Sequence, residues 1–265
     1  MRKSSLLVLS VCSILILFVL VSFVKKKVEK VQVMTTVQEP QTGKACDNGF
    51  AVVELFTSEG CSSCPPAESL MKGLSDTYKG RSVYFVEYHV DYWNKLGWKD
   101  QFSKADFTAH QYFYGSLFHL NSVYTPQAVI NGSFECVGSN ESKITAAIND
   151  QLSSLSAEKQ VLHITANAHQ IMASIEKESL QKDEVAVMVV VGDQATVSIS
   201  RGENSGLKLV HHNIALERIE TAQSGSFSTE YNIDNFTGNI AVLSFVQNKQ
   251  TGKVRSANIV PISKK

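Results

Sequence analysis

The chain has 265 residues, and its 25 lysines and arginines balance its 25 aspartates and glutamates, so the formal net charge at pH 7 is zero. Hydrophobic residues make up 43% and charged residues 19%, which indicates a globular protein with a buried core rather than a disordered chain. Binding to a phosphate backbone requires an excess of basic surface. The balanced charge therefore excludes nucleic acid as an expected partner.

Residues 1–27 predict a membrane anchor or an uncleaved signal. Residues 5–24 carry no charge, and twenty helical residues span about 30 Å, the thickness of a bilayer hydrocarbon core. The small residues of a cleavage site are missing before the lysines at 25–27, which favours an uncleaved transmembrane helix over a removed signal. Residues 28–48 are polar and lack a sustained period, so we expect a linker there.

Two features disagree about the side of the membrane on which the remaining chain lies. The lysine cluster at 25–30 outweighs the basic residues before the anchor, which would place the following residues in the cytoplasm. The four cysteines outside the anchor, Cys46, Cys61, Cys64 and Cys136, are compatible with two disulfides in an oxidising compartment. We follow the cysteines and expect an extracytoplasmic location in the cell envelope. Whether Cys46 pairs with Cys136 is left open.

Hydrophobic periodicity predicts an α/β domain over residues 49–156. The expected elements are a strand at 50–56, a helix at 67–78, a strand at 82–90, a loop and helix at 92–118, two strands joined by the turn Asn131-Gly132, and a helix at 141–155. Their order is βαβ-α-ββ-α.

Residues 157–265 have a different pattern. Strand-length runs alternate with Gly, Asn, Asp and Ser, which predicts a β-rich domain resembling an antiparallel sandwich. Residues 183–192 and 195–200 read as two separate strands. His211 and His212 lie within another predicted strand, where neighbouring side chains point to opposite faces. Both histidines therefore cannot easily bind one ion, and we expect strand packing instead.

The sequence Cys61-Ser62-Ser63-Cys64 stands between a predicted strand and a predicted helix. The amides and dipole at a helix N-terminus favour a thiolate, so we expect Cys61 to be a reachable, ionised nucleophile. Cys64 lies further into the helix, where it can resolve a mixed disulfide by intramolecular attack. Pro65 and Pro66 suit a first helical turn, because its amides have no partners within the helix.

Other residues are expected near the cysteines. Pro126 begins a strand after Thr125, an arrangement compatible with a cis peptide bond and with a groove that binds an extended substrate chain. Glu54 lies on the strand leading to Cys61, where a buried carboxylate could accept the resolving thiol's proton or serve only as a structural hydrogen-bonding group. His89, Asp91 and Trp93 follow the second strand, so they could contact substrate or belong to the core.

The strand-CSSC-helix arrangement and the Thr-Pro before an Asn-Gly hairpin resemble the thioredoxin superfamily. More closely, the chain is similar to the domain of unknown function 1223 family of secreted or envelope bacterial proteins with a thioredoxin-like domain. The similarity runs through VVELFTSEGCSSCPPAE, HVDYWNKLGWKDQF, VYTPQAVING and RGENSGLKLVHHNIALER, and covers roughly residues 50–250. The family usually has Arg-Gln where this chain has His110-Gln111, so no role of that basic residue is carried over.

These observations lead to one functional expectation and two alternatives. The chain is expected to be a thiol-disulfide oxidoreductase that acts on protein thiols or disulfides and needs no organic cofactor. One alternative is a copper or zinc site made of Cys61, Cys64 and His89. The other is a non-catalytic interaction module in which the Cys61–Cys64 disulfide is permanent.

Overall fold

The computed structural model describes residues 49–154, 162–166, 171–175, 180–222, 226–229, 231 and 236–262. The expected anchor, the linker, Cys46 and the domain boundary near residue 157 lie outside these ranges. None of the helices formed by the described residues combines the length and the apolar character needed to cross a bilayer.

The first half of the described chain alternates strands and helices in the predicted order. Its elements are β1 (Ala51–Thr57), α2 (Cys64–Thr77), β2 (Val83–His89), a short 3₁₀ helix η1 (Asn94–Leu96), α3 (Ala105–Leu117), β3 (Gln127–Ile130), β4 (Phe134–Val137) and α4 (Glu141–Ser153). The Asn-Gly hairpin is confirmed, because β3 and β4 pair antiparallel around Asn131 and Gly132, which both have positive φ.

The second half is built from strands. They are β5 (Leu162–Ala166), β6 (Ile171–Ile175), β7 (Glu184–Ser198), β8 (Lys208–Thr221), β9 (Ser226–Thr229), β10 (Ile240–Asn248) and β11 (Val254–Ile262). The two strands predicted at 183–192 and 195–200 are one strand, β7. Its pairing with β8 continues from Gly192 opposite Ile214 to Gln194 opposite His212, so the polar residues at 193 and 194 between the two predicted runs do not end the strand.

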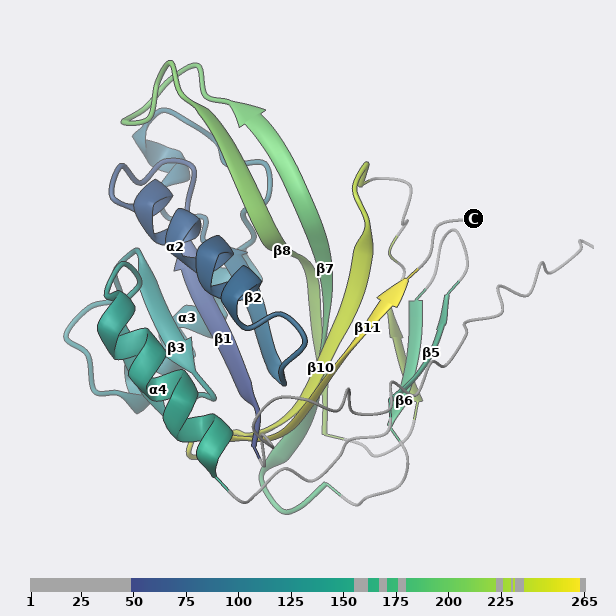
Figure 1. Ribbon diagram of the computed structural model, residues 1–265. Coiled ribbons are helices and arrows are strands. Elements are labelled where there is room, and N and C mark those ends of the chain that lie inside the picture. The colour runs from purple at the N-terminus through teal and green to yellow at the C-terminus, as the bar shows by residue number, and fades with distance from the viewer. Residues whose placement is uncertain are drawn as a thin grey trace, which may run out of the picture. The chain divides into compact units, whose positions relative to one another are not determined.

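Strands from both halves form one eight-stranded sheet in the order β11-β10-β7-β8-β2-β1-β3-β4 (Figure 1). The expected separate sandwich is therefore wrong for β7, β8, β10 and β11, which extend the sheet of the first half. The two groups of strands join where β2 and β8 pair in parallel at Glu87 and Ile214. Strands β5, β6 and β9 form a second, three-stranded sheet. The described residues thus show a mixed α/β domain.

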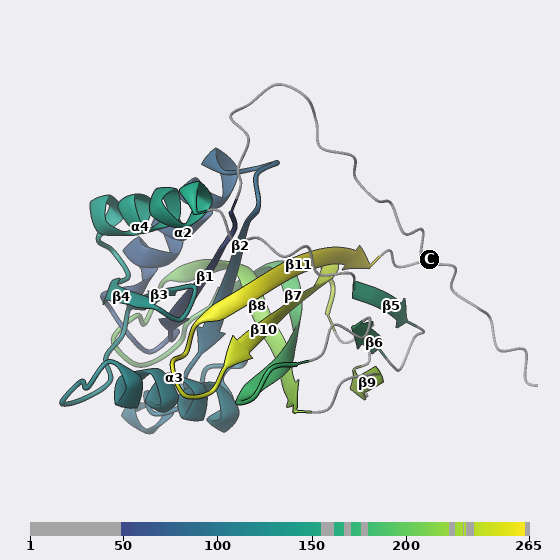
Figure 2. The ribbon, with the colours of Figure 1, turned by 90° about the horizontal axis from the view of Figure 1, so that it is seen from below.

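Helices cover both faces of the first-half strands (Figure 2). Side chains of β1 that are two residues apart point to the same face, so Val53 and Leu55 join the core formed with α2 and α4, whereas Val52 and Phe56 join the core formed with α3. The apolar stripe of α2 is Ala67, Met71 and Leu74.

Two structural features bring distant residues toward the start of α2. The parallel strands β1 and β2 end together, with Thr57 paired to His89, so their carboxyl ends share one sheet edge. The hairpin of β7 and β8 extends toward the same region (Figure 1). Its connection, residues 199–207, is called the hairpin tip below, and it is closed by a hydrogen bond from the Ile199 amide to the Leu207 carbonyl (2.9 Å).

Candidate functional site

Cys61 and Cys64 form a disulfide at the start of α2. Cys64 is the first residue of the helix, and Pro65 and Pro66 occupy its first turn as predicted. The Cys61 amide donates to the Ser58 carbonyl (3.1 Å), and the Cys64 amide donates to the Cys61 carbonyl (3.2 Å). A tight turn therefore leads from β1 into the helix and holds the two cysteines one turn apart.

The prediction that Cys61 is reachable is wrong in this structure. Both cysteines are 0% exposed, although Ser62 and Ser63 between them are exposed. The hairpin tip lies against this turn and forms hydrogen bonds with the backbone of the turn. Asn204 Nδ2 donates to the carbonyls of Glu59 (2.9 Å) and Cys61 (3.0 Å). The Ser62 amide donates to Glu203 Oε2 (3.2 Å). These hydrogen bonds hold the hairpin tip against the turn that carries the disulfide, and this arrangement is called the closed state below.

The Thr125–Pro126 peptide bond is cis, as the sequence allowed. Trp93 connects this bond to the turn that carries the cysteines. Its Nε1 donates to Thr125 Oγ1 (2.9 Å), and its Cβ lies 3.1 Å from the position that a Cβ on Gly60 would take. Thr125, Trp93 and Gly60, the residue before Cys61, are therefore neighbours, which brings two of the predicted contact residues next to the disulfide turn.

Glu54 lies on the opposite face of the sheet from α2. His110 Nε2 donates to Glu54 Oε2 (2.8 Å) and the Tyr114 hydroxyl donates to Oε1 (2.5 Å), and both partners belong to α3. The side chains of β1 alternate between faces, so Glu54 points away from Cys64. Its expected role as the proton acceptor for that thiol is not supported, and its alternative reading as a structural hydrogen-bonding group fits the contacts.

The remaining predicted contact residues are engaged in internal contacts. Asp91 Oδ1 accepts a hydrogen bond from Thr108 Oγ1 (2.6 Å), which fixes the loop after β2 against α3. His89 is 0% exposed, and its Nδ1 donates to Asp100 Oδ2 (2.7 Å). It therefore offers no surface to a substrate, in contrast to the partly exposed Trp93.

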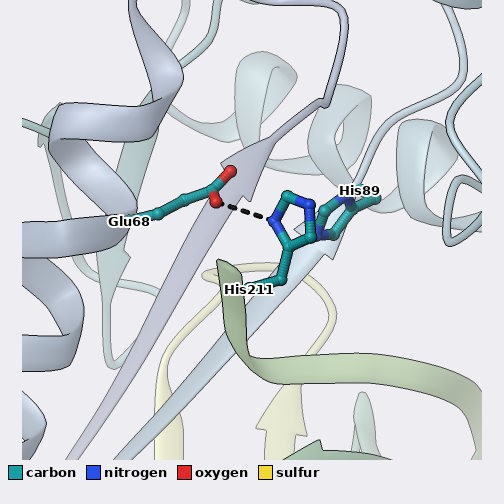
Figure 3. Close-up of side chains that lie close together, drawn as sticks. All are labelled: Glu68, His89 and His211. Carbon is teal, nitrogen blue, oxygen red and sulfur yellow. Dashed lines mark hydrogen bonds and ion pairs between the residues drawn. The ribbon is translucent and has the colours of Figure 1, made fainter. Parts of the chain in front are cut away.

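A layer of six ionisable side chains lies next to the disulfide turn, and all six are buried. This polar layer consists of Glu59, Glu68, Glu87, His89, Asp100 and His211. Glu68 comes from α2, Glu87 and His89 from β2, His211 from β8, and the other two from loops. In Figure 3 the side chains of Glu68, His89 and His211 point toward one another from these three elements.

Hydrogen bonds order most of the polar layer. Glu68 Oε1 accepts from Thr57 Oγ1 (2.5 Å), and Glu68 Oε2 accepts from His211 Nδ1 (2.8 Å). Asp100 also accepts the Glu59 amide (2.8 Å). The imidazole rings of His89 and His211 meet edge to face with centroids 4.9 Å apart. The layer thus links α2, β2 and β8 directly beside the disulfide.

Burial and charge act in opposite directions on these groups. Burial by itself lowers the pKa of His211, but its interactions with Glu59 and Glu68 raise that pKa to about 10. Burial raises the pKa of Glu68, yet the hydrogen bond and the charge of His211, together with the smaller effects of His89 and Thr57, outweigh burial, and the pKa of Glu68 is lowered. Burial, followed by the charge of Glu68, raises the pKa of Glu87 well above its usual value.

Sequence reasoning missed Glu68 and His211. Glu68 stands four residues after Cys64, on the same helical face and beside the apolar stripe of α2, and this charged residue at a buried position was a detectable signal. His211 was assigned to strand packing. Adjacent residues do point to opposite faces, and only His211 points into the layer, whereas His212 is partly exposed.

The structure describes Cys136 but not Cys46, the other cysteine outside the disulfide turn and the expected anchor. Cys136 is a free, buried thiol on β4, and burial together with the charge of Glu135 raises its pKa to about 11. Cys46, whose pairing with Cys136 the sequence left open, lies outside the described residues. A thiol with such a pKa is almost entirely protonated near neutral pH and is a poor nucleophile.

Comparisons with known proteins agree with the predicted family. The model of the family described as "Protein of unknown function (DUF1223)" matches residues 52–247. The crystal structure of protein AGR_C_4864 from Agrobacterium tumefaciens is similar with a TM-score of 0.60 and 24% identity, covering 82% of this chain and 96% of that one. HBP35 of Porphyromonas gingivalis is similar with a TM-score of 0.54 and 15% identity, covering 83% and 77%.

At these identities the two structures support the fold alone. None of the curated proteins is similar enough to this sequence to count as a match. The family match rests on a continuous range that begins in β1, includes the disulfide turn and the hairpin tip, and ends in β10, which is well over half of the chain. The chain therefore belongs to the DUF1223 family.

Proposed function

We propose that this protein is a thioredoxin-like thiol-disulfide oxidoreductase of the cell envelope. The observation that carries the proposal is the Cys61–Cys64 disulfide at the start of a helix that follows a buried strand. The element order βαβ-α-ββ-α and the cis bond before Pro126 support the assignment to a thioredoxin-like fold. The partners would be protein thiols or disulfides, and the exchange needs no organic cofactor.

The chemistry balances within the cysteine pair and its substrate. A substrate thiolate attacks Cys61, the Cys61–Cys64 bond breaks, and Cys64 leaves as a thiolate that takes up a proton. A second substrate thiolate then attacks the substrate sulfur of the mixed disulfide, and Cys61 leaves as a thiolate that takes up a proton, which yields a substrate disulfide and a Cys61, Cys64 dithiol. Two electrons pass from substrate to enzyme. The reverse sequence reduces a substrate disulfide, and the reduction potential of the pair decides the direction.

The covered position of the disulfide adds a step before the chemistry. A cysteine that is 0% exposed cannot be attacked in line until the groups that cover it move, and we take the hairpin tip, which is hydrogen-bonded to the turn, as that cover. The tip's hydrogen bonds to the turn come from Asn204 and Glu203, and most of the tip's residues are exposed. Such a segment belongs to the low-stability part of a fold and can open locally without global unfolding. Exchange would then occur in the open state.

The cellular location is part of the proposal. An uncleaved apolar segment at residues 5–24 would tether the domain to the membrane, and an oxidising compartment would keep the disulfide formed. Trp93 and Thr125, which lie beside the disulfide turn, are the candidate contacts for the substrate chain.

Cysteine variants test the proposal. We expect Cys61→Ser to abolish disulfide exchange with a model dithiol substrate and Cys64→Ser to accumulate a mixed disulfide at Cys61, detectable by mass spectrometry. Cys136→Ser is the matched control, because it removes a buried thiol away from the turn and should leave the exchange rate unchanged. Full exchange activity in Cys61→Ser would refute the proposal.

A redox titration separates the enzyme from the non-catalytic alternative. A potential below roughly −300 mV is typical of a structural disulfide, whereas catalytic pairs lie at higher values. We expect a value in the catalytic range. A pair that resists reduction at every practical potential would instead favour an interaction module with a permanent disulfide.

A further inference from the structure

Several buried polar atoms of the polar layer have no hydrogen-bond partner among the described residues. They are Glu59 Oε1, both carboxyl oxygens of Glu87, His89 Nε2 and His211 Nε2. All four residues are 0% exposed, so bulk water does not reach these atoms. His211 Nε2 and Glu59 Oε1 face each other at 3.6 Å, which is too long for a hydrogen bond. These two atoms form a long ion pair, whereas His89 Nε2 and both oxygens of Glu87 lack even that. Because buried polar atoms in native proteins are almost always paired, these three atoms beside the ion pair indicate a missing partner.

The two histidines are arranged like metal ligands. His89 donates its Nδ1 hydrogen to Asp100, whose carboxylate is itself fixed by the backbone amides of Glu59 and Phe102. His211 donates its Nδ1 hydrogen to Glu68. A carboxylate that holds one ring nitrogen sets the tautomer and the ring orientation, and the other nitrogen is then free to bind a metal. In His89 that other nitrogen is the unpartnered Nε2. In His211 it is Nδ1, where a metal ion would displace the hydrogen now shared with Glu68, while Nε2 keeps its hydrogen toward Glu59 Oε1.

The third component is a carboxylate at suitable range. One ligand atom each from Glu68, His89 and His211 lie within 4.8 Å of one another, and Figure 3 shows the three side chains converging. We propose that His89, His211 and Glu68 bind one divalent transition-metal ion of the zinc type in the polar layer. This site is independent of the thiol chemistry proposed above.

The donor set determines the class of metal. Two imidazoles and one carboxylate form a common three-ligand zinc set that leaves a further coordination position. Hard cations such as Mg²⁺ and Ca²⁺ prefer oxygen ligands alone, so they fit poorly. Glu59 Oε1 lies 3.6 Å from His211 Nε2 and can accept a hydrogen bond from that nitrogen or from a metal-bound water.

The proposed site differs from a site built on the cysteines. Cys61 and Cys64 are bonded to each other and contribute no ligand to this cluster. Its ligands come from α2, β2 and β8, so a bound ion would link the helix that carries Cys64 to the sheet and to the hairpin.

Metal binding by the full chain tests the proposal. Protein freed of metal with a chelator is titrated with Co²⁺, whose visible absorption reports the ligand geometry, and Zn²⁺ content is measured by elemental analysis. We expect one ion per chain and a rise in the thermal midpoint with added Zn²⁺. His89→Ala and His211→Ala should weaken binding at least about 100-fold. Asp100→Asn should weaken it about 10- to 100-fold, because it only orients His89.

Matched variants keep the experiment decisive. His212→Ala changes the neighbouring, outward-pointing histidine and should bind as the wild type does. The Cys61→Ser and Cys64→Ser variants should also retain the ion, so a failure of the exchange proposal leaves this one standing. If the histidine variants do not fold, Glu68→Gln, which preserves shape, takes their place with the same expected loss. The absence of stoichiometric binding in the wild type, or equal losses in His211→Ala and His212→Ala, would overturn the proposal.

Discussion

Replacement of Asn204 by alanine should increase the rate at which the Cys61–Cys64 disulfide is reduced. Asn204 is 3% exposed and donates hydrogen bonds to the carbonyls of Glu59 and Cys61. These bonds fasten the hairpin tip over the turn. The alanine variant loses both bonds in the closed state, whereas in the open state water already satisfies the same groups.

The magnitude follows from the two bonds. Each contributes about 1 kcal/mol net, so the closed state should lose about 2 kcal/mol relative to the open state. Because 1.36 kcal/mol corresponds to a factor of ten, opening should become roughly 30-fold more frequent. If reduction occurs in the open state, the second-order rate constant with a small thiol should rise by that factor, while the unfolding midpoint of the molecule changes little.

The assay is pseudo-first-order reduction by excess dithiol, with the free thiols alkylated and counted by mass spectrometry. Ser205→Ala is the matched control, because the Ser205 hydroxyl donates to the Ser200 carbonyl (3.1 Å) within the tip and does not contact the turn. We expect less than about a two-fold change for that variant. An unchanged rate in Asn204→Ala would refute the idea that the tip covers the disulfide, and equal acceleration in both variants would indicate general loosening instead.

Three further changes test other parts of the structure. Burial, followed by the charge of Arg218, lowers the pKa of His110 to about 4 against the opposing effect of Glu54. The unfolded chain therefore binds this proton near pH 6.5, whereas the folded chain binds it only near pH 4. The contribution to the free energy of unfolding is complete above pH 6.5 and falls by about 3 kcal/mol as the pH drops to 4. Urea unfolding of His110→Gln should show a smaller decrease in the free energy of unfolding over this pH range than the wild type does. Gly73→Ala in the exposed middle of α2 meets no atom within 4 Å and should raise the unfolding free energy by up to about 1 kcal/mol. Gly138→Ala would place its Cβ 2.6 Å from Leu55 Cδ1 and should lower the unfolding free energy by about 1 to 3 kcal/mol; stabilisation by this change would contradict the packing.

Local signals in the sequence were sufficient for the first half of the fold. The apolar run of β1, the one-sided apolar stripe of α2 and the Asn131-Gly132 turn depend on residues within a few positions of one another, and each was predicted from that short range. The placement of Cys64 at the helix start follows from the prolines after it for the same reason.

The fold of the second half was predicted wrongly because it depends on pairing between strands that are far apart in the sequence. The contact between β2 and β8 joins Glu87 to Ile214, and no local pattern records which strand of a later segment will add to an earlier sheet. Without that contact the strands after residue 180 read as a separate sandwich. The same gap hid the role of His211, since its partner Glu68 lies 143 residues away.

Glu54 shows how a single side chain can be assigned to the wrong face. Its position before the cysteines suggested proximity to Cys64, but strand alternation directs it to α3, where His110 and Tyr114 satisfy both carboxyl oxygens. The buried carboxylate nearest in sequence to Cys64 on the α2 side is Glu68. Counting faces along β1 from Val53 and Leu55, which pack against α2, would have excluded Glu54.

The β7–β8 hairpin contacts the region around the disulfide in two places, at the hairpin tip and at His211 in the polar layer. We expect only the contact at the tip to break when the disulfide becomes exposed. Asn204 and Glu203 hold the exposed tip through hydrogen bonds to backbone groups of the turn, whereas His211 anchors β8 in a layer that is sealed from solvent. Pairing between β7 and β8 continues as far as Ser198 and Lys208. The tip can therefore open by bending at its own ends while the paired strands stay in place. On this reasoning a metal ion at His211 leaves the rate of disulfide reduction unchanged, and a marked slowing by Zn²⁺ would mean instead that the whole hairpin must swing away.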